Sequence, residues 1–269
     1  MSTIGLITGT GIYELEGHLE AREVEVGTPW GTVGCQVAMV GEHELVAVAR
    51  HGAGHERLSH QVRHRANLWA LREAGVEAVL GTTVVGIMDP SIPLARPLVF
   101  DELFFPSNRL PDGTLATFFT EPGDPRRGHL IMATPFSPGL RRRLLAAALE
   151  EGLEPVDGGC YVHVDGPRLN TRTEIAWLRS VGGTALSQTC GPEAVLAGEL
   201  ELPYAVLGFG VDHANGVVDP PTAPEELAAN LGRHAAVATR VILRFLAELP
   251  AGEPLPFDSG FVFRMEEQV

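Results

Sequence analysis

The amino-acid sequence predicts an α/β fold, a single domain spanning residues 1–269 in which helices flank a mixed β-sheet. Three observations support this prediction. Short apolar runs typical of buried strands alternate with segments of helical spacing along the chain. Two of these runs, residues 161–164 and 204–211, each place a carboxylate at their C-terminal end, Asp165 and Asp212. Hydrophobic residues make up 45% of the chain, which is enough for a sizeable core.

The first half of the chain contains five predicted strands and one predicted helix. Residues 4–7 form the first buried strand, and the next three strands form a meander at residues 23–26, 35–40 and 45–49. Residues 65–74 carry apolar side chains at helical spacing, and Gly75 ends that helix. Residues 77–86 then form a strand that ends in threonine hydroxyls and a glycine.

The second half begins with a proline- and aromatic-rich connection over residues 90–119. A connection of this length is typical of a binding loop or a subunit contact. Beyond it, strands are predicted at residues 128–135, 161–164 and 204–211, and helices at 138–151, 171–181, 192–200 and 224–249. The tail over residues 250–269 carries three phenylalanines that could cover a neighbouring surface.

The bulk composition excludes several classes of protein. The formal net charge of −14 disfavours nucleic acid and anionic membranes as partners. No apolar run approaches the roughly 20 residues needed to span a bilayer. The first residues lack the basic segment of a secretory signal. Three widely spaced cysteines suit free thiols in a reducing cytoplasm, where we expect the protein, and the sequence lacks a Cys-x-x-Cys pair for zinc.

The basic residues are all arginine. The chain contains 20 Lys+Arg and none of them is lysine. Schiff-base chemistry on lysine and a phosphate loop that depends on lysine are therefore excluded. Any phosphate must be held by arginine, histidine, hydroxyl groups and backbone N–H groups.

The first strand runs into a glycine-rich turn, Thr8-Gly9-Thr10-Gly11. Glycines let the backbone approach an anion closely, and Thr10 adds a hydroxyl. A dinucleotide motif would need a third glycine where Glu14 stands, so that interpretation is disfavoured. A small-anion loop and a purely structural turn both remain open.

Positive charge is concentrated after the fourth strand, in an otherwise acidic chain. The strand ends in Arg50 and His51, and a glycine-rich loop then leads to His55. Residues 57–64 add further arginines and histidines, including His64. A solvated loop explains any single histidine, but the clustering favours an oxyanion or phosphate clamp.

The stretch from Cys160 to Gly216 concentrates the remaining polar chemistry at predicted strand ends and helix starts. Ligands of open α/β sheets bind at such edges. Glu174 follows an N-cap at Asn170 or Thr171 and is explained by a capping box. Thr189 precedes a helix whose N-terminus suits an anion. Glu193, in the first turn, either complements the helix dipole or contacts a ligand.

Four ordered segments carry a resemblance to a known family. They read TGTGIYELEG, ARHGAGHERLSHQVRHRANLWALREAGVEAVLGTTVVG, VDGPRLNTRTEIAWLR and GPEAVLAGELELPYAVLGFGVDHANG. Together they resemble the 5′-methylthioadenosine/purine nucleoside phosphorylase family, in its trimeric branch. The resemblance implies a twisted, barrel-like mixed sheet and a homotrimer with active sites at subunit borders. It also implies reversible phosphorolysis of a purine nucleoside with inorganic phosphate as co-substrate, and with no metal or organic cofactor.

The resemblance also assigns residues to the implied site. The implied phosphate ligands are Thr10, Arg50, His51, Thr83, Val84 and Thr189. The implied nucleoside contacts are Leu169 near the purine, Ser187, Gln188 on the ribose, Asp212 and Ala214. Asp212 is the implied catalytic residue, placed to hydrogen-bond N7 or the 6-substituent of the purine. Possible contacts to the sugar or its 5′-group are His55, His64 and His129.

Several departures from the family pattern fall on the ribose and base walls. Gln188 replaces a methionine, Ala214 replaces a second aspartate, and Arg63-His64 replaces Asn-Tyr. Asp212 favours 6-aminopurines, so we expect 5′-methylthioadenosine or a related 5′-modified adenosine as substrate. A phosphorylase of 6-oxopurine nucleosides or of 5′-methylthioinosine is the alternative. A catalytically silent nucleoside-binding homologue and a hydrolase using water are the further alternatives.

Overall fold

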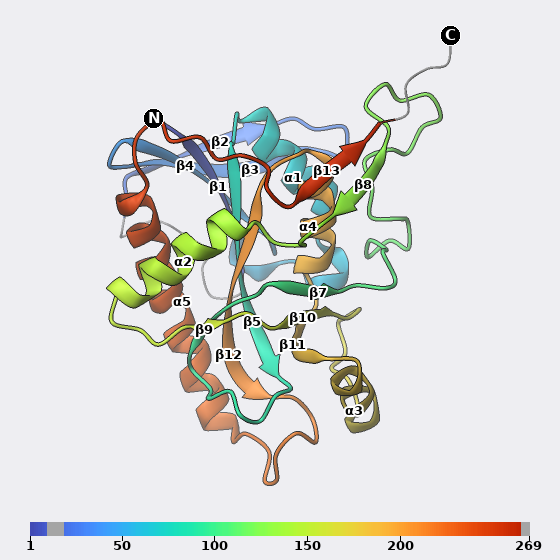
Figure 1. Ribbon diagram of the computed structural model, residues 1–269, viewed down its shortest axis with the longest axis vertical. Helices are drawn as coiled ribbons and strands as arrows, with labels where there is room; N and C mark the ends of the chain where they lie inside the picture. The colour runs from blue at the N-terminus through green and yellow to red at the C-terminus, as the bar shows by residue number, and fades with distance from the viewer. Residues whose placement is uncertain (10–18, 265–269) are drawn as a thin grey trace.

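The computed structural model describes residues 1–9 and 19–264 (Figure 1). In these described residues an eleven-stranded mixed sheet forms the centre, and five α-helices flank the sheet. The strands of the sheet are β1 (Thr3–Thr8), β2 (Ala21–Val26), β3 (Val33–Val40), β4 (His43–Ala49), β5 (Ala78–Ile87), β6 (Pro97–Val99), β7 (Glu102–Phe104), β9 (Val156–Asp157), β10 (Cys160–His163), β11 (Gly183–Ser187) and β12 (Tyr204–His213). The prediction of a mixed sheet flanked by helices is confirmed.

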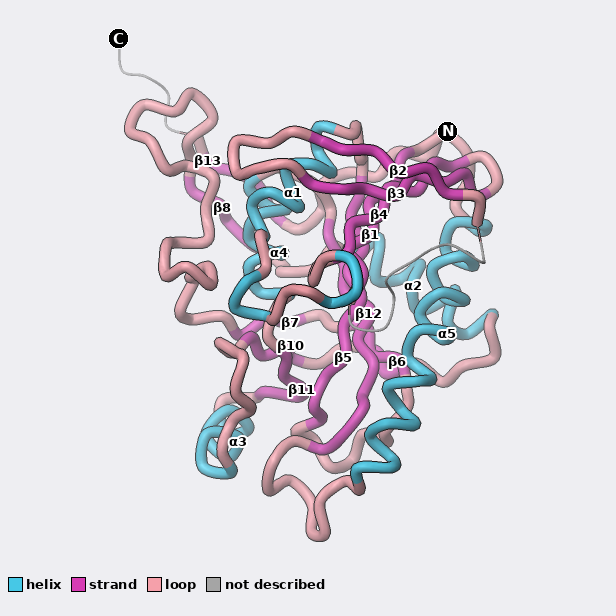
Figure 2. Tube along the Cα trace, turned by 180° about the vertical axis from the view of Figure 1, so that it is seen from behind, coloured by secondary structure: helices cyan, strands magenta, loops and turns pink. Residues whose placement is uncertain are grey.

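The sheet follows the order β2-β3-β4-β1-β5-β11-β10-β7, and β12 pairs with β5 along its other edge. Strands β4, β1, β5 and β12 run parallel, whereas β2, β3 and β4 form the predicted antiparallel meander. β6 pairs antiparallel to β12, and β9 extends from β6. The long, paired strands β5 and β12 therefore lie at the centre of the molecule, between the helices of the two faces (Figure 2).

One edge of β5 changes partner along its length. Pairing with β1 ends at Gly81, and pairing with β11 begins only at Gly86. Among the described strands, none pairs with residues 82–85 on this edge. The backbone of that stretch is therefore open to side chains and ligands, because its polar groups still need partners.

Helices cover both faces of the sheet. α2 (Pro138–Glu150) and α5 (Pro224–Glu248) pack together on one face, while α1 (His64–Glu73) and α4 (Cys190–Glu199) lie on the other (Figures 1 and 2). Because successive strand residues point to opposite faces, Leu6 packs in the α2–α5 core and Ile7 in the α1–α4 core. Both faces are buried, which explains the continuous apolar runs of β1 and β5.

α3 (Arg172–Ser180) carries the capping box that the sequence predicts. The Thr171 hydroxyl accepts a hydrogen bond from the Glu174 amide, and the Glu174 carboxylate accepts one from the Thr171 amide. Glu174 also forms an ion pair with Arg168, in the loop between β10 and α3. This carboxylate therefore orders a loop and a helix start.

Five strands were not predicted. β6 and β7 lie in the connection that was expected to be irregular, and β9 and β11 are also short. β13 (Gly260–Phe263) pairs with β8 (His129–Met132) as a separate two-stranded sheet. Short strands with distant partners leave little period-2 signal in the sequence, so pattern alone misses them. Within the described residues, no helix is both long and apolar enough to cross a membrane.

Candidate active site

A cavity of about 330 Å³ opens where β5 changes partner. Its walls come from the end of β4 and the loop after it, the open stretch of β5, the turn from β11 into α4, the end of β12, and the loop between β10 and α3. The described residues that line it are Arg50, His51, His55, Leu58, Ser59, Thr83, Val84, Val85, Gly86, Pro167, Leu169, Asn170, Ile175, Leu186, Ser187, Gln188, Thr189, Val211, Asp212, Ala214, Asn215 and Leu227.

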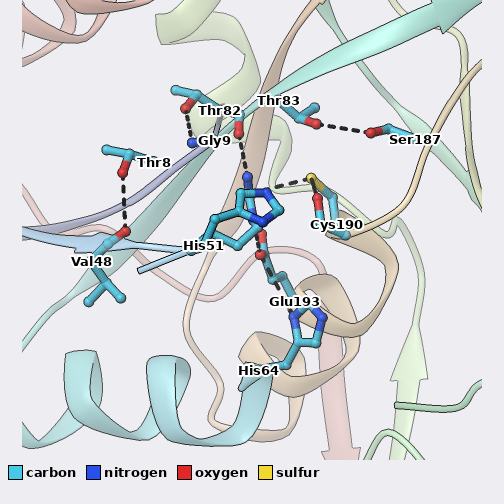
Figure 3. Close-up of polar contacts among 12 residues, drawn as sticks. Thr8, Gly9, Val48, His51, His64, Thr82, Thr83, Ser187, Cys190 and Glu193 are labelled. Carbon is cyan, nitrogen blue, oxygen red and sulfur yellow. Dashed lines mark hydrogen bonds and ion pairs between the residues drawn. The ribbon is translucent and has the colours of Figure 1, made fainter. Parts of the chain in front are cut away.

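Arg50 occupies the unpaired edge of β5. Its Nη1 donates to the carbonyl oxygen of Thr82 at 2.8 Å, and the Thr82 hydroxyl accepts from the Gly9 amide at 3.0 Å (Figure 3). A Cβ on Gly9 would lie 2.5 Å from the Thr82 carbonyl oxygen and 3.0 Å from Nη1 of Arg50. Glycine is therefore required at this position, and the start of the glycine-rich turn lies directly beside the guanidinium.

Glu193 holds the other side of the Arg50 guanidinium. Its two carboxylate oxygens accept from Nε at 2.5 Å and from Nη2 at 2.9 Å, and both side chains are only 1% exposed. The Tyr204 hydroxyl donates to the same carboxylate at 2.6 Å. Burial alone would lower the pKa of Arg50, but the adjacent carboxylate raises it above its ordinary value. Glu193 is thus an ion-pair partner of Arg50, a role that neither sequence interpretation anticipated.

His51 and His55 form a stacked pair at the cavity wall, with ring centroids 4.4 Å apart and planes 17° apart. Nδ1 of His51 lies 2.9 Å from the carbonyl oxygen of Arg57, so this nitrogen carries the proton and Nε2 remains an acceptor. Burial, with help from Arg50, lowers the pKa of His51 to about 4. His51 is therefore neutral at pH 7.

Hydroxyl groups from three elements meet at the same end of the cavity. The Thr83 hydroxyl on β5 lies 3.3 Å from the Ser187 hydroxyl at the end of β11 (Figure 3). Thr189 follows at the start of α4 and is buried. The amides of Thr189 and Cys190 donate to the Tyr161 hydroxyl, so the first N–H groups of this helix are already occupied.

Gln188 joins two walls of the cavity through its amide group. Its Oε1 accepts from the Ser59 hydroxyl at 2.7 Å, and its Nε2 donates to the Arg168 carbonyl oxygen at 2.9 Å. Because both ends of the amide are satisfied, the alkyl stem remains for packing against a ligand. Leu169 follows Arg168 and is 73% exposed beside the cavity.

Asp212 lies at the far end of β12, where a register shift interrupts pairing with β5. Burial raises the pKa of its carboxyl group to about 6 from an ordinary 3.8. In the described parts of the chain, no group hydrogen-bonds to this carboxylate. A Cβ on Gly86 would lie 3.4 Å from the carboxylate and 3.7 Å from the Ala214 methyl. The lack of a side chain at Gly86 keeps this end open for a flat ligand.

Two predicted site residues in the described part of the chain, His64 and His129, do not line the cavity. His64 is buried behind the ion pair, with Nδ1 3.8 Å from Glu193 (Figure 3). The structure places His64 away from the cavity because the first turn of α1 faces α4, and its possible contact with the sugar stays a prediction. His129 lies on β8 in a separate cavity of about 570 Å³, so it reaches no ligand in the first cavity of the same chain. Thr10 lies outside the described residues.

Several cavity residues were not predicted. The main ones are Leu58, Ser59, Gly86, Asn170 and Asn215. The Asn215 amide donates to the Asn170 carbonyl oxygen at 2.7 Å, and both residues line the cavity together with Asp212. Gly86 follows the predicted threonines on β5, so its place on the strand was a usable signal. Ser59 and Asn215 lie in irregular segments that carry no periodicity. In the residues covered by the structure, no group of three His, Cys, Asp or Glu is arranged to hold a metal ion.

Comparison with known proteins gives consistent matches. Residues 3–247 match the family model of the Phosphorylase superfamily. The chain is 32% identical to the 6-oxopurine nucleoside phosphorylase of Pyrococcus furiosus, covering 93% of this chain and 94% of that one. It is 34% identical to the S-methyl-5′-thioadenosine phosphorylase of Mycobacterium tuberculosis, covering 95% and 97%. It is also 34% identical to a probable S-methyl-5′-thioinosine phosphorylase of Methanopyrus kandleri, covering 95% and 96%.

Solved structures show the same fold. A methylthioadenosine phosphorylase from an antarctic soil metagenomic library superposes with a TM-score of 0.85 at 24% identity, over 99% of this chain and 93% of that one. The methylthioadenosine phosphorylase of Schistosoma mansoni in complex with adenine gives a TM-score of 0.81 at 24% identity, over 92% and 91%. At this level of identity the likeness concerns the fold.

Proposed function

The chain belongs to the phosphorylase superfamily, and from this premise we propose that it catalyses phosphorolysis of a purine nucleoside. One observation carries the proposal: a single cavity has hydroxyls, Arg50 and His51 at one end and an unpartnered carboxyl group, Asp212, at the other. The first end suits an oxyanion and the second suits the edge of a base, with room for a sugar between them.

The phosphate end is assigned to Arg50, His51, Thr83, Val84 and Thr189, with Thr10 as a further proposed ligand. Hydroxyls and backbone N–H groups donate to phosphate oxygens, and His51 offers an acceptor to a phosphate O–H group. Ser187, beside Thr83, lies where the sugar and phosphate ends meet. Gln188 packs its stem on the ribose, and Leu169 covers the purine.

The proposed reaction is a displacement at the anomeric carbon. One oxygen of hydrogen phosphate bonds to C1′ while the bond from C1′ to N9 of the purine breaks, and the bonding pair leaves with the base. The free base takes up one proton and hydrogen phosphate loses one, so atoms and charge balance. Asp212, when protonated, donates to N7 of the departing base and regains its proton from solvent. The reaction as proposed uses no group beyond inorganic phosphate.

5′-Methylthioadenosine or a related 5′-modified adenosine is the proposed substrate. The Asp212 carboxyl group can both donate to N7 and accept from a 6-amino group, which supports an adenine base. Leu58 and Leu227 line the same cavity and provide apolar surface for an alkylthio group. A 6-oxopurine nucleoside or 5′-methylthioinosine is the second candidate, because Ala214 supplies no second acid near the base.

Incubation with a nucleoside panel, with and without phosphate, tests this proposal. Phosphate-dependent release of adenine supports the first substrate, and release of hypoxanthine supports the second. Phosphate-independent release would indicate a hydrolase. No release from any nucleoside, with binding retained, would indicate a silent homologue and contradict the proposal.

We also propose a homotrimer in the cytoplasm. Exposed apolar side chains at one end of the molecule support subunit contacts: Leu115, Ile131, Phe261 and Phe263. His129 lies in the cavity beside this surface and would then face a neighbouring subunit. All three cysteines are unpaired, which supports a reducing compartment.

A further inference from the structure

Arg50 is almost fully committed to partners within the protein. Of its five N–H groups, two bond the Glu193 carboxylate and one bonds the Thr82 carbonyl oxygen, while Nη2 also lies 3.8 Å from the Cys190 sulfur. The guanidinium is 1% exposed. Only a small part of it, on the Nη1 side beside Gly9, remains for a ligand.

The phosphate end of the cavity therefore carries little net positive charge. Arg50 is the sole arginine among the described residues that line the cavity, and the chain has no lysine. Glu193 cancels its charge at hydrogen-bond distance. The other described groups at this end are hydroxyls, the neutral His51 and the His55 ring stacked on it. An anion bound here is held mainly by hydrogen bonds.

We propose that Glu193 is a positioning residue that both orients Arg50 and neutralises it, so that the charge of bound phosphate remains available to the reacting sugar. This inference rests on the proposed phosphorolysis. Glu193 does not line the cavity, so it acts through Arg50. Tyr204 fixes the carboxylate in turn, through its 2.6 Å hydrogen bond.

The physical reason lies in the charge that develops during the reaction. As the bond from C1′ to N9 breaks, positive charge builds on the sugar, and the phosphate anion beside it stabilises that charge. An unpaired buried guanidinium would bind phosphate tightly in the ground state and reduce this stabilisation. Catalysis gains only from interactions that strengthen in the transition state. An arginine whose charge is neutralised by Glu193 positions the phosphate but does not offset the negative charge that stabilises the sugar.

Replacing Glu193 by glutamine tests the proposal, because it removes the charge and keeps the size. We expect E193Q to bind inorganic phosphate about tenfold tighter in calorimetry, since a buried negative charge near the anion is lost. We expect kcat to fall about tenfold or more. A purely structural role would weaken phosphate binding instead. Unchanged or weaker binding by folded E193Q would overturn the proposal.

A double substitution keeps the test decisive if E193Q does not fold. Arg50→Gln alone should weaken phosphate binding about a hundredfold, because it leaves Glu193 buried and unpaired. Arg50→Gln combined with Glu193→Gln removes both charges and should recover part of the affinity, at least about tenfold over Arg50→Gln. No recovery would also overturn the proposal.

Two control variants are needed. One changes the geometry of the Glu193 side chain but keeps its charge, and the other changes the net charge of the protein at a distant carboxylate. Glu193→Asp keeps the charge and should retain a phosphate affinity within about threefold of the parent, showing no tightening. Glu151→Gln removes another carboxylate that is paired with arginines but does not line the cavity. It should change neither the phosphate affinity nor kcat. Phosphate binding is measured without nucleoside. An inactive parent chain that binds phosphate would therefore contradict the proposed function, while the binding data would still test the role of Glu193.

Discussion

The two ends of the cavity are built differently. The phosphate end is buried and cross-linked by hydrogen bonds between residues far apart in sequence, such as Arg50 with Glu193 and Arg50 with Thr82. The nucleoside end is formed by loops and strand ends, with Leu169 73% exposed and Asp212 without a partner among the described residues. At the phosphate end, residues proposed to bind phosphate also form buried hydrogen bonds that stabilise the fold. At the nucleoside end, Asp212 is left free for a ligand.

Asp212→Ala should produce the largest loss of activity with no loss of stability. Proton donation to the leaving base contributes about 10²–10⁴-fold, so kcat/KM should fall about a thousandfold. The unfolding free energy at pH 7 should stay equal or rise, because a buried carboxylate is removed. Steady-state kinetics and urea unfolding measure the two effects. A variant with near-parental kcat/KM would remove Asp212 from the mechanism.

Arg50→Ala should damage both activity and stability. The phosphate KM should rise about a hundredfold, because the variant leaves a buried carboxylate beside the anion. The unfolding free energy should fall by about 3–5 kcal/mol for the same reason. The nucleoside Kd, measured without phosphate, should change little. Equal stability losses from Arg50→Ala and Asp212→Ala would contradict the difference between the two ends.

The pH dependence of stability should also separate the two ends. Burial lowers the pKa of four histidines, and His51, His64 and His163 lie near the phosphate end. Their stability contribution is complete above about pH 6.5 and is lost as the pH falls toward their folded pKa values of about 3–4. Asp212 has a raised pKa, so its contribution has the opposite sign and is lost as the pH rises through about 6.

Near pH 5 the four histidines each add about one proton on unfolding, while Asp212 releases about one. For these five groups the net uptake is about three protons, so their contribution to the unfolding free energy should fall by about 4 kcal/mol for each unit by which the pH is lowered. Urea unfolding between pH 4.5 and 7 measures this slope. The variant Asp212→Asn should steepen it, and His64→Gln should flatten it. A flat profile down to pH 5 would contradict the assigned protonation states.

Gln188→Met should give the smallest effect. The variant loses the hydrogen bonds to Ser59 and Arg168 but keeps an unbranched stem for the ribose. We expect a stability loss of about 1–2 kcal/mol and a nucleoside KM that changes about threefold or less, with the phosphate KM unchanged. Ser59→Ala, which removes one of these bonds, is the matched control. A large change in phosphate KM would show that the two ends are coupled.

The sequence predicted the elements that carry long regular patterns. The strands β1, β4, β5 and β12 and all five helices were expected within one or two residues of their observed bounds. β11 was missed because Gly183–Ser187 is short and rich in small residues, and its partner β5 lies about 100 residues away. The break in β5 pairing that opens the cavity follows from β11 and could not be predicted without it.

The site residues were predictable where a strand end or helix start places them. Arg50, Thr83, Thr189 and Asp212 all line one cavity, and their assigned ligands stay predictions. Pairwise partners were not predictable, because Glu193 and Arg50 are 143 residues apart and no periodicity links them. His64 was named as a possible sugar contact from the resemblance, and the structure places it behind the ion pair. The family resemblance identified candidate site residues, and the structure shows which of the described ones lie together at one cavity.

The most direct test is whether inorganic phosphate is incorporated into a sugar 1-phosphate. Phosphorus-31 NMR can follow the protein with 5′-methylthioadenosine and inorganic phosphate while chromatography measures free adenine. The account predicts a new sugar 1-phosphate signal that grows in step with adenine, one for one, and that grows about a thousandfold more slowly in Asp212→Ala. Adenine released without a sugar 1-phosphate, or neither product with any purine nucleoside, would contradict it.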